Sequence, residues 1–171
     1  MNEERIITFN GGVDEGSALT AIMQLLYLDS ESKTEPIQMY LNSNGGNIVH
    51  GLAIYDTIKY ISAPVYITCT GLAASMGAFL LSCGEKGHRA ALKHSKILIH
   101  QPLVTSRGAF SQKESDLRKL ADGLMKDRQV LEQIMADNSN QPIEKMHAWC
   151  ERDNWLTAEE AKEIGLIDEV I

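Results

Sequence analysis

Residues 65–81 read VYITCTGLAASMGAFLL. The β-branched and aromatic side chains of residues 65–70 predict a strand, Gly71 predicts a sharp turn, and the apolar run 78–81 predicts a helix. Ser75 is therefore expected near a helix N-terminus. There, unpaired backbone N–H groups and the positive end of the helix dipole favour negative charge, which acyl transfer develops on an oxyanion.

Two further residues complete a candidate nucleophilic site. His100 follows an apolar run in ILIHQP, residues 97–102, and Asp153 lies in ERDNWLT, residues 151–157. A serine becomes a good nucleophile when an imidazole takes its proton and a carboxylate orients that imidazole, and the three can occur in any chain order. Taken singly, Ser75 is more typical of a helix cap and His100 of a hydrogen-bonded strand end.

Four sequence blocks resemble the signature blocks of the Clp protease proteolytic subunit family. They occur in the family's order, and the resemblance extends from about residue 5 to the end of the chain. Four linked blocks are highly specific, whereas one alone would be weak. The blocks are Asn42-Ser43-Asn44-Gly45-Gly46, residues 71–81 (GLAASMGAFLL), residues 99–103 (IHQPL) and Glu151-Arg152-Asp153.

The resemblance implies a role for each matching residue. It makes Ser75 the nucleophile, His100 the general base and Asp153 the carboxylate that orients His100. It places the oxyanion hole at the backbone N–H groups of Gly46 and Met76, and Gly46 suits this role because a residue without Cβ lets the substrate carbonyl approach closely. The resemblance also makes Arg152 a candidate for an ion pair that couples two rings.

The family also implies a fold and an assembly. We expect one α/β domain over residues 1–171, a crotonase-like spiral of β-β-α units, with a handle at about 104–150 that projects from it. The family assembles as two stacked heptameric rings, a tetradecamer that encloses its active sites. It cleaves peptides and, with a Clp-type ATPase chaperone, unfolded polypeptides. The resemblance implies a homo-oligomer that uses no cofactor and no metal.

Composition excludes several other classes of protein. The 171 residues are 44% hydrophobic, which is typical of one globular domain. The formal net charge of −7 disfavours nucleic-acid binding, since phosphate contacts require clustered Lys and Arg. Residues 1–5 lack the pattern of a signal peptide and no stretch approaches a membrane span, so the prediction is a cytoplasmic protein. The cysteines lack metal-ligand spacing and are expected to be small core residues: Cys69, Cys83 and Cys150.

The first half of the chain predicts alternating strands and helices. Residues 5–9 and 37–42 are expected as strands, Gly11-Gly12 and Gly45-Gly46 as turns, and Asp14 as a helix start. Residues 89–92 and 96–100 are expected as short strands. Two helices are indicated by apolar residues at helical spacing: Leu19, Ile22, Met23 and Leu26 in one, and Ile48, Leu52 and Ile58 in the other.

The longest helical pattern follows Pro102. Ser111 and Glu114 fit a capping box, as do Thr157 and Glu160 before a shorter helix, and residues 166–171 are expected as a final strand. The long helix is either an ordinary core-facing helix or, by resemblance, the handle that packs against a facing ring. Its apolar stripe consists of Leu117, Leu120, Ala121, Leu124, Leu131, Ile134 and Met135.

Alternatives and departures from the family pattern remain. A crotonase-fold enzyme acting on acyl-CoA would share the oxyanion hole but would not need the triad, and neither would a non-catalytic ring subunit. The evidence for a phosphate-binding loop at Gly45-Gly46 is weak, because no Gly-Lys-Ser/Thr follows.

The sequence also departs from the family pattern at the docking pocket. Tyr40 matches an aromatic of the family's docking pocket, whereas Gln38 stands where another aromatic is usual. The family's N-terminal pore segment is not matched, so we expect weak docking of the ATPase.

Overall fold

The computed structural model describes residues 4–103 and 113–171. One seven-stranded sheet carries the order β1-β2-β3-β4-β7, with β5 paired to both β3 and β6. Every pairing is parallel except the antiparallel pair of β5 and β6. The strands are β1 (Ile6–Val13), β2 (Ile37–Gly46), β3 (Val65–Ala74), β4 (Arg89–Ala91), β5 (Lys96–Ile99), β6 (Asn154–Thr157) and β7 (Glu169–Val170).

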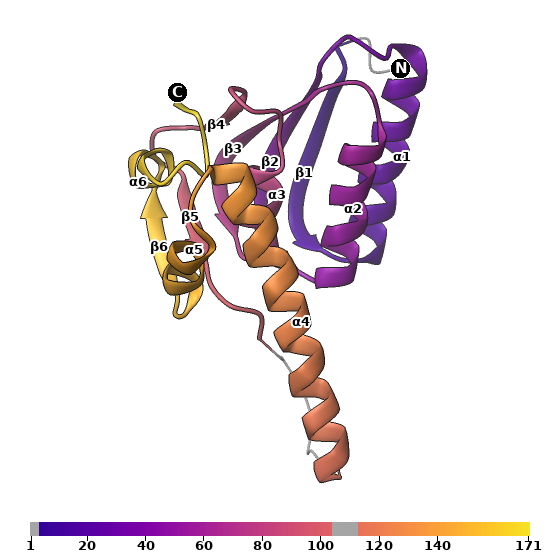
Figure 1. Ribbon diagram of the computed structural model, residues 1–171. Helices are drawn as coiled ribbons and strands as arrows, with labels where there is room; N and C mark the ends of the chain where they lie inside the picture. Colours follow the sequence, from indigo (N-terminus) through magenta and orange to yellow (C-terminus); the bar gives the residue numbers. More distant parts are fainter. Residues whose placement is uncertain (1–3, 104–112) are drawn as a thin grey trace.

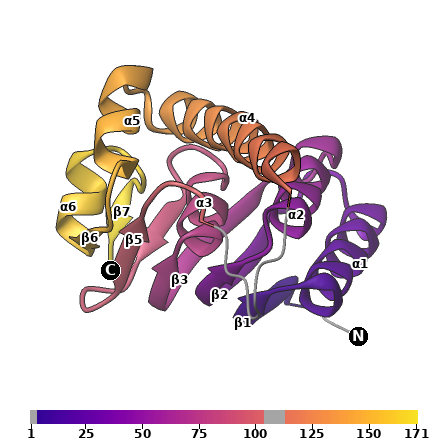
Figure 2. The same cartoon turned by 90° about the horizontal axis from the view of Figure 1, so that it is seen from below.

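Helices connect the parallel strands and gather over the sheet. Figures 1 and 2 show α1 and α2 side by side next to β1 and β2, while α5 and α6 lie at the opposite end beside β6. Between these ends α4 crosses the sheet and extends well beyond it. The helices are α1 (Glu15–Glu31), α2 (Ile48–Tyr60), α3 (Met76–Ser82), α4 (Glu114–Ser139), α5 (Ile143–Cys150) and α6 (Ala158–Glu163).

Strand β2, which lies between β1 and β3, has one covered face and one open face. Ile37, Met39 and Leu41 are almost fully buried, whereas the alternating residues Gln38 and Tyr40 are partly or largely exposed. Parallel sheets are usually covered on both faces, so this open face is unusual for the isolated chain.

Most predicted elements are confirmed, but the predicted glycine turns are wrong. Gly11-Gly12 lies inside β1, where Gly11 has φ +91° beside a shift in the β1–β2 register. Gly45-Gly46 forms the end of β2, and Gly71 continues β3. In each case the glycine permits a bulge or a close backbone contact within a strand, so the chain turns at other residues.

The first helix confirms its predicted start but turns most of its predicted apolar stripe outward, and of the four predicted residues only Ile22 packs against the core. Asp14 caps α1 in a reciprocal pair with Ser17. Leu19, Met23 and Leu26 are 57%, 62% and 42% exposed. The core face consists instead of Ala18, Ala21, Leu25 and Leu28. The helix therefore offers a second apolar surface that no part of residues 4–103 and 113–171 covers.

Among the described residues, the contacts that bury α4 lie in its C-terminal half. Leu131 and Met135 belong to the core, whereas Leu117 and Leu120 are 47% and 38% exposed. Figure 1 shows the N-terminal turns of α4 projecting from the body of the molecule. The predicted cap Ser111 lies outside the described residues, and Lys113 is the observed N-cap. The predicted Thr157–Glu160 capping box at α6 is confirmed, and the predicted final strand shortens to β7.

Candidate active site

Ser75 forms the turn between β3 and α3 in a strained conformation. Its φ of 56° and ψ of −121° are rare for a residue with a side chain, and such strain is typically held in place by the surrounding structure. The Ser75 N–H donates to the Leu98 carbonyl at 2.8 Å, and the Phe79 N–H donates to the Ser75 carbonyl at 3.0 Å. Within the described residues the Ser75 hydroxyl makes no capping hydrogen bond to α3. The side chain is therefore not a helix cap.

The end of β2 packs directly against this turn. A methyl group at Gly45 would lie 2.5 Å from the Ala74 carbonyl oxygen, 2.7 Å from the Ser75 Cβ and 3.0 Å from the Met76 nitrogen. One at Gly77 would lie 2.8 Å from the Ser43 carbonyl oxygen. Only glycine fits at either position without displacing backbone atoms. The first N–H of α3 is thus held beside the Gly45-Gly46 segment.

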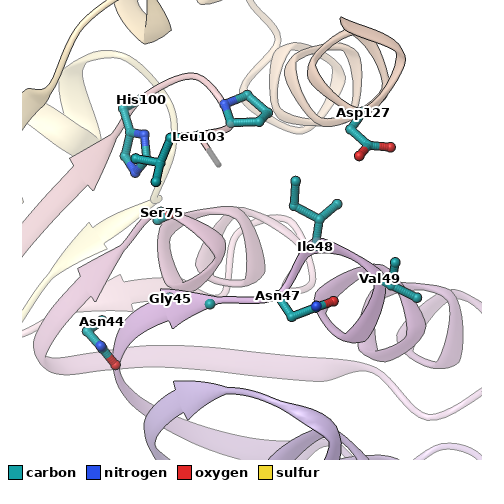
Figure 3. Close-up of a pocket in the computed structure, with 11 residues that line it drawn as sticks. Asn44, Gly45, Asn47, Ile48, Val49, Ser75, His100, Leu103 and Asp127 are labelled. Atoms are coloured by element: carbon teal, nitrogen blue, oxygen red, sulfur yellow. The ribbon is translucent and has the colours of Figure 1, made fainter. Parts of the chain in front are cut away.

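His100 faces the same space from the end of β5 (Figure 3). Its Nδ1 lies 2.6 Å from the carbonyl oxygen of Gln101. A carbonyl oxygen only accepts hydrogen bonds, so Nδ1 carries the proton and, in the neutral ring, Nε2 keeps a free lone pair. His100 is therefore in the tautomer that a general base at Nε2 requires.

Asp153 lies near His100 in the strand register but is not bonded to it. Ile99 pairs with Asn154 in the antiparallel β5–β6 ladder, and the Gln101 N–H donates to the Cys150 carbonyl at 2.6 Å. Residues 151–153 bulge out between these two contacts. Asp153 is exposed and has no hydrogen-bond or ion-pair partner in residues 4–103 and 113–171. The structure thus brings Ser75 and His100 to the same cleft and leaves Asp153, the third predicted residue, without a hydrogen bond to His100.

A cleft of about 610 Å³ opens over Ser75 (Figure 3). Its walls come from the end of β2, the start of α2, the segment after β5, and α4. A small apolar recess continues beneath Ser75 and His100 toward α4. The cleft is lined by Asn44, Gly45, Gly46, Asn47, Ile48, Val49, Ser75, His100, Pro102, Leu103 and Asp127, and the recess includes Met76, Phe79, Leu131, Glu132 and Met135.

Comparison with known proteins agrees with this geometry. The family model described as Clp protease matches residues 1–171. The chain belongs to the Clp protease family. It is 48% identical over 171 residues to the ATP-dependent Clp protease proteolytic subunit 3 of Synechococcus sp. (strain CC9605), and this match covers the whole chain and 84% of that protein. It is also 49% identical over 172 residues to the ATP-dependent Clp protease proteolytic subunit 2 of Prochlorococcus marinus (strain MIT 9312). This match covers the whole chain and 83% of that protein.

Membership of the Clp protease family confirms the predicted family and the predicted α/β fold of the crotonase-like type. The predicted protease class is also confirmed, since relatives nearly half identical over the full chain are named proteolytic subunits. Neither alternative from the sequence, an acyl-CoA enzyme or a non-catalytic ring subunit, gains support from these names. The helices of the described chain are all too short or too polar to cross a bilayer.

The three cysteines of the chain do not compete with Ser75 as nucleophiles. Burial raises the pKa of the Cys83 and Cys150 thiols to about 12, so both are protonated and poor nucleophiles at neutral pH. Cys69 is likewise buried and free. No cluster of three or more His, Cys, Asp or Glu side chains that could hold a metal ion occurs in the part of the chain that the structure describes.

Sequence reasoning missed the residues that α4 contributes. Asp127 faces the cleft, and Arg128 and Glu132 lie behind it, although they follow His100 by more than 25 residues along the chain. No local motif marks them, because their place depends on how α4 crosses the sheet. Gln101 lies within the IHQPL motif of residues 99–103, but the sequence predicts no role for its side chain.

Proposed function

We propose that this chain is a serine endopeptidase whose acyl-enzyme forms on Ser75. The observation that carries the proposal is the strained Ser75 turn, which presents a hydroxyl not used as a cap beside His100 in an open cleft. A strained strand-to-helix turn is how unrelated hydrolases expose a nucleophilic serine. Family membership supports the same reaction class.

In the proposed reaction the Ser75 Oγ attacks the carbonyl carbon of the scissile peptide bond. His100 Nε2 accepts the hydroxyl proton and then gives it to the departing amine as the C–N bond breaks. A water molecule next attacks the acyl-enzyme while the same nitrogen takes its proton. That proton passes to the Ser75 Oγ as the acyl C–O bond breaks, which releases the acid and free Ser75. The backbone N–H groups of Gly46 and Met76 are the proposed oxyanion donors. Met76 fits because the first N–H of a helix has no partner within it.

Asp153 is proposed to orient His100 in the working state. For this, the imidazole must exchange its Nδ1 hydrogen bond from the Gln101 carbonyl to the Asp153 carboxylate. The β5–β6 register supports the proposal, because it places residues 151–153 alongside His100. The carboxylate also stabilises the imidazolium that forms during the reaction, which a carbonyl does less well.

Peptides and unfolded polypeptides are the proposed substrates, and a Clp-type ATPase is the proposed partner. The relatives' names support this, since they describe the proteolytic subunit of an ATP-dependent protease. We also propose a double heptameric ring with residues 104–150 as its handle. The uncovered apolar residues on α1 and on the projecting turns of α4 support an assembly. Cytoplasmic localisation stays a prediction.

Arg152 is the proposed residue that couples the rings. It is exposed, adjoins Asp153, and makes no hydrogen bond or ion pair with any other residue that the structure describes. Arg152→Ala should therefore lower oligomer mass and peptidase activity together. Light scattering and peptide hydrolysis measure both, and Lys86→Ala, which removes another exposed cation, is the control.

Fluorophosphonate labelling tests the proposed chemistry. The wild-type chain should be labelled on Ser75, and Ser75→Ala should lose both the label and peptide cleavage while keeping its circular dichroism spectrum. Ser62→Ala is the matched control because Ser62 is exposed at the end of α2, away from the cleft. Undiminished cleavage by Ser75→Ala would remove Ser75 from the mechanism.

A further inference from the structure

Arg128 on α4 connects three segments that surround the site. Its Nε donates to the Glu132 Oε1 at 2.7 Å on the same helix. Its other two nitrogens donate to the Gln101 Oε1 at 2.9 Å and to the Glu151 Oε2 at 2.8 Å. One planar guanidinium thus joins α4, the segment after β5 and the segment before β6. A fork of fixed donors suits this geometry better than a single ammonium does.

Gln101 connects Arg128 to His100. Its carbonyl oxygen accepts the His100 Nδ1 hydrogen bond, and its side-chain amide donates to the Glu151 carbonyl at 2.7 Å. Its own N–H donates to the Cys150 carbonyl. Gln101 therefore links His100 to the segment that leads directly into Asp153, and Arg128 holds the Gln101 side chain in this position.

Arg128 and Glu132 are shielded from water, whereas Glu151 is 52% exposed. The side chains of Arg128 and Glu132 are 17% and 4% exposed, and the second Glu132 oxygen accepts from His147 Nδ1 at 2.8 Å. The hydrogen bond from Arg128 also lowers the pKa of the Glu151 carboxyl. By contrast, the Arg118–Glu114 pair on the same helix is 77% and 78% exposed and touches no part of the site. A shielded ion pair with several hydrogen bonds holds its side chains in one arrangement, whereas an exposed ion pair contributes little to stability.

We propose that Arg128 is a positioning residue for peptide hydrolysis: from α4 it fixes Gln101 and Glu151, and thereby the placement of His100 relative to Asp153. This inference rests on the proposed triad. It means that a displacement of α4 at Arg128 changes the alignment of His100, so the handle and the reaction are mechanically linked. Misplacing a reacting group by about 1 Å can cost about 10²-fold in rate.

The test compares Arg128→Lys with Arg118→Lys in the full chain. Lysine keeps the positive charge near Glu132, but its three donors sit on one nitrogen and cannot reach the acceptors that Arg128 meets with three separate nitrogens. The fold should therefore be preserved and the alignment lost. We expect kcat for a short fluorogenic peptide to fall at least tenfold in Arg128→Lys with KM unchanged within twofold. The rate of fluorophosphonate labelling should fall by a similar factor. Arg118→Lys should match the wild type in both.

A second variant removes the intermediate link. Gln101→Met keeps the length of the side chain and deletes its bonds to Arg128 and Glu151, so it should lower kcat as Arg128→Lys does. The double variant should lose clearly less than the product of the two single losses, because both substitutions break the same Arg128–Gln101 bond. A purely structural role would instead lower the melting temperature and oligomer mass in proportion to activity.

Wild-type kcat in both single variants would overturn the inference, as would a loss of kcat that follows unfolding. Additive losses in the double variant would also overturn it. These outcomes are distinct from failure of the proposed function, because wild-type labelling that depends on Ser75 establishes the nucleophile independently of Arg128.

Discussion

The His100 imidazole donates from Nδ1 to the carbonyl oxygen of its neighbour Gln101, at 2.6 Å. This bond occupies the nitrogen that the Asp153 carboxylate would need. It also fixes the tautomer that leaves Nε2 free toward the Ser75 side of the cleft. The backbone therefore performs one of the two tasks of a triad carboxylate, the choice of tautomer. Stabilising the imidazolium is left to Asp153.

Asp153→Asn should consequently reduce kcat by less than a triad usually shows. In a serine protease whose carboxylate also sets the tautomer, the corresponding change costs about 10⁴-fold in kcat. Here the Gln101 carbonyl still holds the tautomer, so we expect a loss of roughly 10- to 1,000-fold, since only the electrostatic part is removed. Peptide hydrolysis under saturating substrate measures it. Asp56→Asn, on the exposed face of α2, is the control; a full 10⁴-fold loss would show that Asp153 alone sets the tautomer.

Gly45→Ala should inactivate the site by crowding rather than by backbone conformation alone. Gly45 and Gly87 have similar φ values, +83° and +89°, but a methyl group at Gly87 meets no atom within 4 Å. Gly87→Ala should therefore cost only the conformational strain of positive φ, about 1–2 kcal/mol. Gly45→Ala should cost about 1–3 kcal/mol more from overpacking against Ala74 and Ser75.

Chemical denaturation measures both costs, and peptide hydrolysis should be lost only in Gly45→Ala. Equal destabilisation and equal activity in the two variants would show that the end of β2 relaxes away from Ser75.

The Arg89–Asp168 pair predicts how stability depends on pH. The Arg89 side chain is 3% exposed, and its Nε and Nη2 donate to the two Asp168 oxygens at 2.8 and 2.6 Å. Burial raises the pKa of Asp168, but the hydrogen bonds from Arg89 and Gly87 outweigh it and hold the pKa below 3.8. The stabilisation is therefore complete above the unfolded pKa and is lost as pH falls through the lower folded pKa.

Asp168→Asn should cost about 3–5 kcal/mol at pH 7, the usual result of leaving a buried charge without its partner. The difference from wild type should shrink as pH falls below about 4, because protonation then weakens the wild-type pair as well. Urea denaturation at several pH values measures it. Glu114→Gln removes a largely exposed partner of Arg118 and should cost no more than about 1 kcal/mol. A gap between Asp168→Asn and wild type that is independent of pH would contradict this account.

The sequence predicts the elements well where a local signal decides them. Asp14 and Thr157 begin helices because their side chains satisfy the first N–H groups, and no distant contact is needed. The predicted turn at Gly71 fails because glycine also serves close backbone packing within strands. The actual turn falls at Ser75, where strain is maintained by neighbouring strands that sequence alone does not reveal.

The candidate site likewise has one part that short motifs predict and one part that depends on tertiary contacts. Ser75 and His100 fall in short blocks that a family resemblance identifies. Their meeting depends on the parallel pairing of β3 and β5, which brings Ala74 opposite Leu98. Arg128 could not be predicted, because two of its three partners, Gln101 and Glu151, reach it only when α4 packs against α3 and α5. Tertiary packing, not local preference, creates that cluster.

The open face of β2 leads to a prediction about the ATPase. Gln38 and Tyr40 lie on this face two residues apart, and Gln38 is in register with Tyr66 of β3. Aromatic side chains in apolar surroundings often dominate interface energy. Gln38→Tyr would place a second aromatic beside Tyr40 and Tyr66, and such a pair contributes about 0.5–1.5 kcal/mol. We therefore expect the variant to bind a Clp-type ATPase about 2- to 10-fold more tightly.

Surface plasmon resonance with a Clp ATPase, and ATP-driven degradation of a tagged protein, measure this gain. Hydrolysis of short peptides should stay at the wild-type rate, since Gln38 lies outside the cleft. Tyr40→Ala should weaken docking, and Lys162→Tyr on α6, at the other end of the sheet (Figure 1), should leave it unchanged. If Gln38→Tyr and Tyr40→Ala both bind as the wild type does, the ATPase docks on another surface and the open face of β2 has a different partner.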